Sequence, residues 1–346
     1  MMASGKQTAG GDVLNSGKRI GWIDLAKGIC IVLVVFNHVS VALKVDYPLA
    51  EQVNSFRMPL YFVLSGLFFK QYEGFVGFLK RKTNKLLIPF VFFLLATSVI
   101  PYWLLHHENS LKGFFNEMNG PMYNFAIWFL LCLFEINILF YFIQWLAGRL
   151  APRHQVVTVI AVSLLLGCCG LILGLNRVWV PLYLATMLTA LPFFAFGWWL
   201  RRHSDFLSSP VNLKRDLLVA VAGLLIIGLF PAPVIYSFNV VPGHNVAMVY
   251  VCGILGTMMV LILSKMIGHL PLVSFWGRYS IMILCTHQFI VVSMAWLALK
   301  FAPSLPAPVQ IITVFLATLF VCHWMIHFMK RFMPHVTAQK DVIRVP

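Results

Sequence analysis

The sequence has little charge: 11% of its 346 residues are Asp, Glu, Lys or Arg, whereas 60% are hydrophobic. Its mean hydropathy is +0.86. This composition excludes a soluble globular domain, in which about a quarter of the residues are charged. Apolar runs recur at the length of a membrane-spanning helix. We therefore predict an all-α, polytopic membrane protein.

Acidic residues are especially scarce, with 11 Asp and Glu against 26 Lys and Arg, and the formal net charge is +15. A basic balance can indicate nucleic-acid binding, but these cations are scattered over short loops rather than gathered in one soluble patch. Anionic lipid headgroups explain them better. The predicted partner is therefore a lipid bilayer and not a nucleic acid.

Patterns typical of metal and disulfide proteins are also missing. The seven cysteines lie in apolar runs and have neither a disulfide framework nor a zinc-ligand spacing. His323 and His327 are spaced like two ligands on one helix face, but no Glu follows the first His and no third ligand is evident. The sequence therefore predicts no metal site.

We expect ten helices, both chain ends cytoplasmic, and one membrane domain over residues 18–335 between polar cytoplasmic tails at 1–17 and 336–346. The predicted helices cover residues 21–43, 54–70, 86–105, 124–148, 155–175, 179–200, 217–236, 245–266, 272–299 and 307–330. The protein is accordingly predicted to be a multi-pass protein of the cell membrane, the inner or plasma membrane.

The distribution of Lys and Arg sets the predicted orientation, because these residues concentrate in cytoplasmic loops. On the side opposite the chain ends, the loops contain only Lys44, Lys112, Arg177 and Lys300. The basic loop 71–85 is therefore predicted to be cytoplasmic, and segments 44–53 and 106–123 to face outward.

Three ionisable side chains occur inside the first apolar run, GWIDLAKGICIVLVVFNHVS, which contains Asp24, Lys27 and His38. Ionisable groups are costly in hydrocarbon and usually mark a functional site. Lys27 and His38 share one helix face, about 16 Å apart along the axis. One face of one helix is thus predicted to carry an ion pair of Asp24 with Lys27 near its inner end and an imidazole near its outer end.

Arg57 lies at the outer end of the second predicted helix, at the depth of His38. A packing role would also explain the histidine, but the nearby arginine favours function. A neutral imidazole suits the removal of a proton from a hydroxyl near neutral pH.

Other polar residues within the spans have competing explanations. Lys27 and Arg278, toward the cytoplasmic side, suit a phosphate, although Arg278 also fits an interfacial anchor. Small residues such as Ser65 more often serve helix packing. Glu135 and His287 need partners within the membrane. Trp128 suits an interfacial anchor or a platform for a sugar ring.

Five segments together resemble the acyltransferase-3 family of integral membrane acyltransferases, in its short form without an appended periplasmic domain. The resemblance lies in WIDLAKGICIVLVVFNH, with ten residues between a basic residue and a His, and in FRMPLYFVLSGLFFK, FLKRKTNKLLIPF, IWFLLCLF and WGRYSIMILCTHQF. The family motif commonly has Arg at the position of Lys27, and Lys keeps the charge but loses the planar fork. Residues 150–265 match only in hydropathy.

The resemblance implies transfer of an acyl group, commonly acetyl from acetyl-CoA, to a hydroxyl of a carbohydrate, polysaccharide or lipid-linked glycan. In that reaction His38 is expected to act as general base, with Arg57 and Asp24 as further catalytic residues. Lys27, Arg278 and Ser65 are expected to bind acyl-CoA. Trp128, Glu135 and His287 are candidates for acceptor binding.

Two other classes of function fit the buried charges. A transporter or flippase for a polar substrate also uses charged residues within the membrane, although neither a repeat nor matched broken helices are visible. A receptor or assembly subunit without catalytic activity is the third alternative. Acyl transfer by the purified protein would distinguish an acyltransferase from both of these alternatives.

Overall fold

The computed structural model describes residues 20–72, 74–100, 124–178, 180–232, 234–235, 241–242 and 248–345. Over these residues the chain is an all-helical, polytopic membrane protein, with one two-residue antiparallel pairing of Val234–Ile235 and Val241–Pro242. The tail predicted at 1–17 and the outward segment predicted at 106–123 lie outside the described residues.

The first half of the described chain consists of seven α-helices and short 3-10 and π-helical segments. It contains α2 (Gly21–Leu43), α3 (Ala50–Leu67), α4 (Gly74–Lys82), α5 (Ile88–Leu94), α8 (Trp128–Leu150), α9 (Gln155–Leu175) and α10 (Leu184–His203). The second half contains α11 (Leu213–Leu229), α12 (Met248–Ile267), α13 (Pro271–Arg278), α14 (Ser280–Phe301) and α15 (Ala307–Phe332).

Eight helices of the described chain are long and apolar enough to cross a membrane. The runs predicted at 54–70 and 217–236 are also helical, as α3 and α11, but they are not among these eight. α3 contains Glu51 and Arg57, and α11 has only 17 residues. Burial inside the bundle, rather than apolar composition, accounts for the position of α3, whose neighbours include α10 and α12.

Two predicted boundaries are wrong. The helix expected to begin at residue 86 begins at Gly74, so most of the predicted loop 71–85 is helical. Hydropathy hid these turns because they carry Lys80, Arg81 and Lys82, while Phe78 on the same helix is buried. The helix expected over 272–299 is broken at Tyr279, which separates α13 from α14.

The chain from Gly74 to Val99 includes two π-helical segments, Thr83–Leu87 and Leu95–Val99. A π-helical turn has one more residue than an α-turn and therefore redirects the side chains that follow. Such turns are frequent at functional sites. The first of them contains Asn84 and Lys85.

Reciprocal glycine contacts hold α3 against α10. A Cβ atom added at Gly66 would overlap the backbone carbonyl of Phe194, and one added at Gly197 would overlap the carbonyl of Val63. Small residues allow this close backbone approach within a membrane. Arg201 of α10 also donates a 3.1 Å hydrogen bond to the carbonyl of Leu67, at the end of α3.

A second reciprocal contact crosses α13 over the start of α2. A Cβ atom at Gly28 would overlap the carbonyl of Val273, and one at Gly277 would overlap the carbonyl of Asp24. This crossing fixes the direction in which α14 leaves α13. It thereby brings α14 alongside α2.

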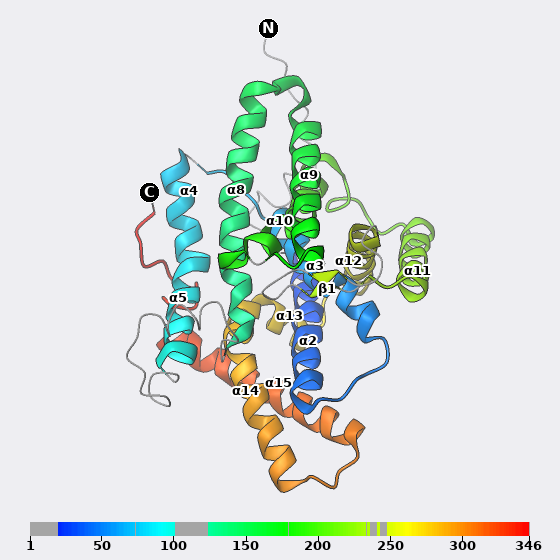
Figure 1. The fold of residues 1–346 in the computed structure, drawn as a ribbon, viewed down its shortest axis with the longest axis vertical. Coiled ribbons are helices and arrows are strands. Elements are labelled where there is room, and N and C mark those ends of the chain that lie inside the picture. The colour runs from blue at the N-terminus through cyan, green and yellow to red at the C-terminus, as the bar shows by residue number, and fades with distance from the viewer. Residues whose placement is uncertain are drawn as a thin grey trace.

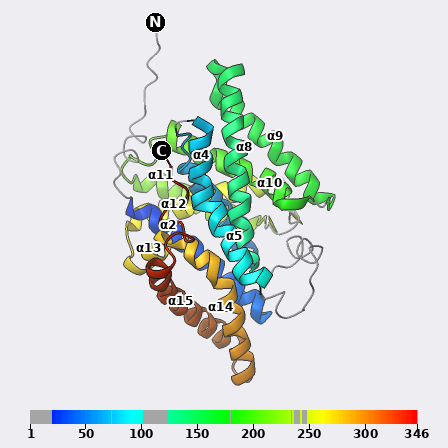
Figure 2. The ribbon, with the colours of Figure 1, turned by 90° about the vertical axis from the view of Figure 1, so that its left-hand side faces the viewer.

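The helices form an elongated bundle in which the α8–α9 hairpin projects at one end and the α14–α15 hairpin at the other (Figure 1). The side view shows the same separation of the two hairpins (Figure 2). After α15 the chain returns toward α4, where the C-terminus lies at the end of the bundle that the charge distribution predicts to be cytoplasmic.

Candidate active site

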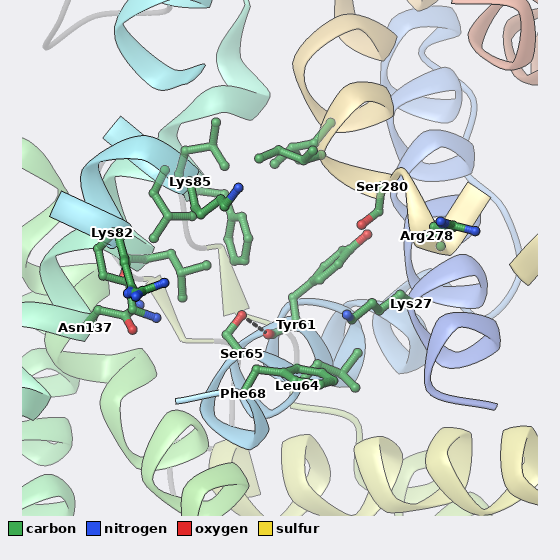
Figure 3. Close-up of a pocket in the computed structure, with 18 of the residues that line it drawn as sticks. Lys27, Tyr61, Leu64, Ser65, Phe68, Lys82, Lys85, Asn137, Arg278 and Ser280 are labelled. Atoms are coloured by element: carbon green, nitrogen blue, oxygen red, sulfur yellow. Dashed lines mark hydrogen bonds between the residues drawn. The ribbon is translucent and has the colours of Figure 1, made fainter. Parts of the chain in front are cut away.

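A basic cavity of about 430 Å³ opens among α2, α3, α4, α8 and α14. Five cations line it, and they come from segments far apart in the sequence: Lys27, Arg81, Lys82, Lys85 and Arg278. Figure 3 shows Lys27, Lys82, Lys85 and Arg278 around the opening. The described residues supply no carboxylate to its lining. The cavity therefore suits an anionic ligand.

Aromatic rings hold several of these cations at the cavity. The Lys27 ammonium lies 4.3 Å from the ring centroid of Phe68, and the Arg81 guanidinium lies 4.5 Å from that of Tyr72. Each such contact stabilises an exposed cation by about 0.5–1 kcal/mol. The rings therefore help to position the two cations at the cavity.

Polar groups also line the deeper part of the cavity. Ser65 donates a 2.8 Å hydrogen bond to the carbonyl of Tyr61, one turn earlier on α3. The hydroxyl of Tyr61 points toward the hydroxyl of Ser280 on α14 (Figure 3). Asn137 lines the opposite wall, from α8. The walls thus combine apolar surface with a few hydrogen-bonding groups, as is typical of ligand pockets.

A pair of histidines lies farther along the same helices. The rings of His38 on α2 and His287 on α14 have centroids 5.0 Å apart. The Nδ1 atom of His287 lies 2.8 Å from the carbonyl oxygen of Ile283 and 3.1 Å from that of Leu284. Carbonyl oxygens only accept hydrogen bonds, so Nδ1 carries the proton and Nε2 of the neutral ring is an acceptor.

That acceptor atom, Nε2 of His287, is buried and has no hydrogen-bond partner among the described residues. The whole His287 side chain is 0% exposed. A buried polar atom without a partner costs about 1–3 kcal/mol, and each such atom calls for an explanation. A ligand that donates a hydrogen bond beside His38 would provide one.

Arg57 completes this end of the site. Its Nε and Nη1 atoms are buried without a hydrogen-bond partner in the described part of the chain, and its charge acts on both imidazoles. The thiol of Cys30 donates a 3.1 Å hydrogen bond to the carbonyl of Arg57 and so ties α2 to α3. Burial raises the pKa of the nearby Tyr47 hydroxyl, and the positive charge of Arg57 opposes that rise.

The cavity and the histidine pair are consecutive along two helices. Tyr61 and Leu284 line the cavity, whereas Arg57 and His287 follow about one turn farther on, roughly 5–6 Å along the helix axes. On α2, Lys27 at the cavity and His38 lie about three turns apart, roughly 16 Å along the axis. A ligand that extends through the cavity from Lys27 to Tyr61 thus ends about one helical turn from His287.

The structure brings most of the predicted residues together. Lys27, Ser65 and Arg278 line the cavity, and His38, Arg57 and His287 form the group beyond it. Asp24 lies where α13 crosses α2, with its carbonyl against Gly277. Its ion pair with Lys27 and its catalytic role stay predictions.

Glu135 and Trp128 lie elsewhere. On α8, Leu130, Leu133 and Asn137 face the cavity, whereas Trp128 and Glu135 share the opposite stripe at helical spacing. The Trp128 ring packs 5.8 Å from that of Tyr183 and is only 6% exposed. Acceptor binding by these two residues stays a prediction, and it concerns a place separate from the cavity.

Sequence reasoning missed several cavity residues. Arg81, Lys82 and Lys85 are predicted to lie in a cytoplasmic loop that supports the topology and the family resemblance, and Tyr61 and Asn137 are not among the predicted site residues. The basic segment 74–85 does contain a sign of a helix, because apolar residues recur on one face of it at Phe75 and Phe78. That periodicity predicts a helix, and a helix would have directed part of the run inward.

Comparison with protein families gives one result, and it agrees with this arrangement. The model of the acyltransferase-3 family, described as an acyltransferase domain, matches residues 20–327. No curated protein and no solved structure matches the chain. The matched range includes Lys27, His38, Arg57 and His287, and it extends over most of the sequence. The chain therefore belongs to the acyltransferase-3 family and is a membrane acyltransferase.

Proposed function

We propose that the protein is a membrane O-acyltransferase that moves an acyl group, in the first place acetyl, from acyl-CoA to a hydroxyl of a carbohydrate, polysaccharide or lipid-linked glycan. The proposed location is the cell membrane, inner or plasma, with the donor bound from the cytoplasm. One observation carries the proposal: the inner edge of a basic cavity lies one helical turn from the pair of His38 and the fully buried His287.

The basic cavity is the proposed donor site. Coenzyme A carries several phosphates on one end and its thioester on the other, joined by a long, narrow arm. The cations at the opening are complementary to the phosphates. The distance from Lys27 to His38, about 16 Å by helical rise, is on the order of the length of that arm. A donor held at the opening would therefore place its thioester near the histidines.

His38 is the proposed general base. Its imidazole takes the proton of the acceptor hydroxyl, and the oxygen attacks the thioester carbonyl to form a tetrahedral intermediate. The negative charge on the former carbonyl oxygen is stabilised by the guanidinium of Arg57, whose Nε and Nη1 atoms have no other partner among the described residues. When the C–S bond breaks, the sulfur takes the proton back from His38, and the acyl ester and free CoA result.

His287 is the proposed second imidazole of the reaction. Its Nε2 atom is an acceptor because Nδ1 donates to backbone carbonyls. Nε2 of His287, beside His38, can accept a hydrogen bond from the hydroxyl that is to be acylated and so orient it. It can also stabilise the protonated state of His38. Proton transfer by positioned groups of this kind contributes typically about 10²–10⁴ in rate.

The acceptor is proposed to enter from the outer end. Beyond His38, the loop after α2 places Tyr47 over Phe36, with ring centroids 4.9 Å apart, and its hydroxyl 3.5 Å from Oδ1 of Asn37. These polar groups lie at the level of the histidines, toward the end of α2 that is far from Lys27. Donor and acceptor would then approach the same imidazoles from opposite ends.

The test is acyl transfer by the purified protein. Reconstituted protein is supplied with radiolabelled acetyl-CoA and with membranes of a deletion strain as the source of acceptor. We expect label in the glycan or glycolipid fraction together with release of one free thiol per acetyl group. Binding of acetyl-CoA without thiol release would overturn the proposal. Movement of an unmodified polar or glycan substrate across the bilayer would identify a transporter.

A further inference from the structure

The chain after α15 is held against the helical segment Gly74–Leu87, which carries the cavity cations Arg81, Lys82 and Lys85. One side chain, Asn84, makes three hydrogen bonds to this segment: Nδ2 donates to the carbonyl of Ile343 at 2.8 Å, and Oδ1 accepts from the amides of Val342 and Ile343 at 3.0 and 2.9 Å. Asn84 is 1% exposed. We call residues 333–345 the tail segment.

The side chain next to Asn84 belongs to both the tail segment and the cavity. Lys85 lines the cavity opening. Its Nζ atom also lies 3.0 Å from Oδ1 of Asp341 and donates a 2.9 Å hydrogen bond to the carbonyl of Ala338. The tail segment therefore places a carboxylate on a cation of the proposed donor site.

The two attachments differ in how easily they are broken. The amide of Asn84 is buried and uses both of its polar atoms on the tail backbone, which is a specific and water-excluded contact. The Lys85–Asp341 pair is half-exposed, at 48% and 40% of the two side chains, and exposed pairs are weak. A phosphate would compete successfully for such a lysine.

We propose that the tail segment is a strap beside the donor opening, anchored at Asn84, in which Asp341 competes with an anionic group of the donor for Lys85. The inference rests on the proposed function, because it needs an anionic donor at this cavity. With the donor absent, the carboxylate neutralises Lys85. When the donor binds, Lys85 changes partner while the anchor keeps the strap beside the opening.

The strap predicts that removing one negative charge improves donor binding. We expect Asp341→Asn to bind CoA roughly two- to fivefold more tightly than the wild type, the range that a released surface ion pair provides. The measurement is titration of the full-length protein in detergent with CoA itself. The matched control is Asp205→Asn, which removes another exposed carboxylate, one in the segment between α10 and α11. The control should bind CoA as the wild type does.

A double mutant shows whether Lys85 carries the effect. In a Lys85→Gln background, Asp341→Asn should no longer change CoA affinity, because the shared partner is gone. Hydrogen–deuterium exchange tests the anchor separately: Asn84→Ala should speed exchange of the Val342 and Ile343 amides. Deletion of residues 337–346 is the second variant if Asn84→Ala does not fold, and it should tighten CoA binding as Asp341→Asn does.

The outcomes separate the strap from the donor site. If wild-type protein binds CoA but Asp341→Asn binds it equally or more weakly, the strap is wrong and the donor site stands. If exchange of the two amides is as fast in the wild type as in Asn84→Ala, the anchor is wrong. If the wild type does not bind CoA at all, the donor site is wrong, and the strap falls with it.

Discussion

The two ends of the site solve the problem of polar groups within the membrane differently. At the opening, cations lie on aromatic faces, as Lys27 does on Phe68 and Arg81 on Tyr72. The inner end of the site, meaning here the end formed by Arg57, His38 and His287 and not the cytoplasmic end of α2, is different. Several nitrogen atoms of Arg57 and His287 are buried there without a hydrogen-bond partner in the described chain. The half-buried cations Lys27 and Arg81 thus lie at the cavity against aromatic rings, whereas polar atoms at the second end are buried with their hydrogen-bonding capacity unused.

The difference indicates what each end is suited to do. A cation on an aromatic face gains about 0.5–1 kcal/mol, less than the roughly 1.5–3 kcal/mol of a hydrogen bond to a charged group, so phosphate displaces the ring at little cost. A buried hydrogen-bonding group without a partner is already fixed in position, and it can stabilise a charge that develops at that position during the reaction. Binding is thus expected at the opening and chemistry at the inner end.

Substitution at the inner end should give the largest effect. We expect His38→Gln to lower the transfer rate by about 10²–10⁴ while CoA affinity stays unchanged, because Gln can hydrogen-bond but cannot take a proton at neutral pH. The measurement is thiol release from acetyl-CoA with acceptor membranes. His154→Gln, at an exposed position after α8, is the control. A Gln variant that keeps most of the wild-type turnover would make His38 a packing residue.

Substitution of His287 should give the next largest effect, since its ring lies 5.0 Å from that of His38. We expect His287→Gln to lower the rate about 10²-fold at unchanged CoA affinity, the lower end of the range for positioned proton-transfer groups. The control is His323→Gln on α15, because Nδ1 of His323 is also buried without a partner among the described residues but packs near Phe275 instead. Equal loss in both variants would mean a general packing defect.

Substitution at the opening should change binding and leave the chemistry alone. We expect Lys27→Gln to raise KM for acetyl-CoA about tenfold with kcat unchanged, as loss of one charge-assisted contact to a phosphate predicts. Lys44→Gln, an exposed position just after the other end of the same helix, is the control. A fall in kcat at constant KM would place Lys27 with the inner end and remove the distinction between the two.

The smallest effect on the reaction should come from the packing that keeps the two ends in register. We expect Gly197→Ala to destabilise the protein by about 1–3 kcal/mol, because the new methyl group overlaps the Val63 carbonyl across the α3–α10 crossing. The readout is the apparent melting temperature in detergent. Gly228→Ala on α11 has no heavy atom within 4 Å of its new methyl group and should be neutral or stabilising. Equal melting of the two variants would contradict the crossing.

Much of the fold could be predicted from hydropathy because a membrane helix is recognisable in the sequence as an apolar run of sufficient length. The first helix was predicted over 21–43 and is observed at Gly21–Leu43. The method failed where a charged run is helical, from Gly74, and where one apolar run is bent, at Tyr279. In both places the decisive interactions come from other helices: α8 borders the first, and α2 crosses the second.

The sequence by itself determined the membrane character of the chain, its family and the shared face of Lys27 and His38, because each depends on composition, ordered motifs or the periodicity of one helix. Tertiary structure alone decided that His287 meets His38 and that the tail segment reaches Asn84. These contacts join residues more than two hundred positions apart. The meeting of the two histidines depends on how backbones cross at Gly28 and Gly277, and no local pattern encodes the angle of a crossing.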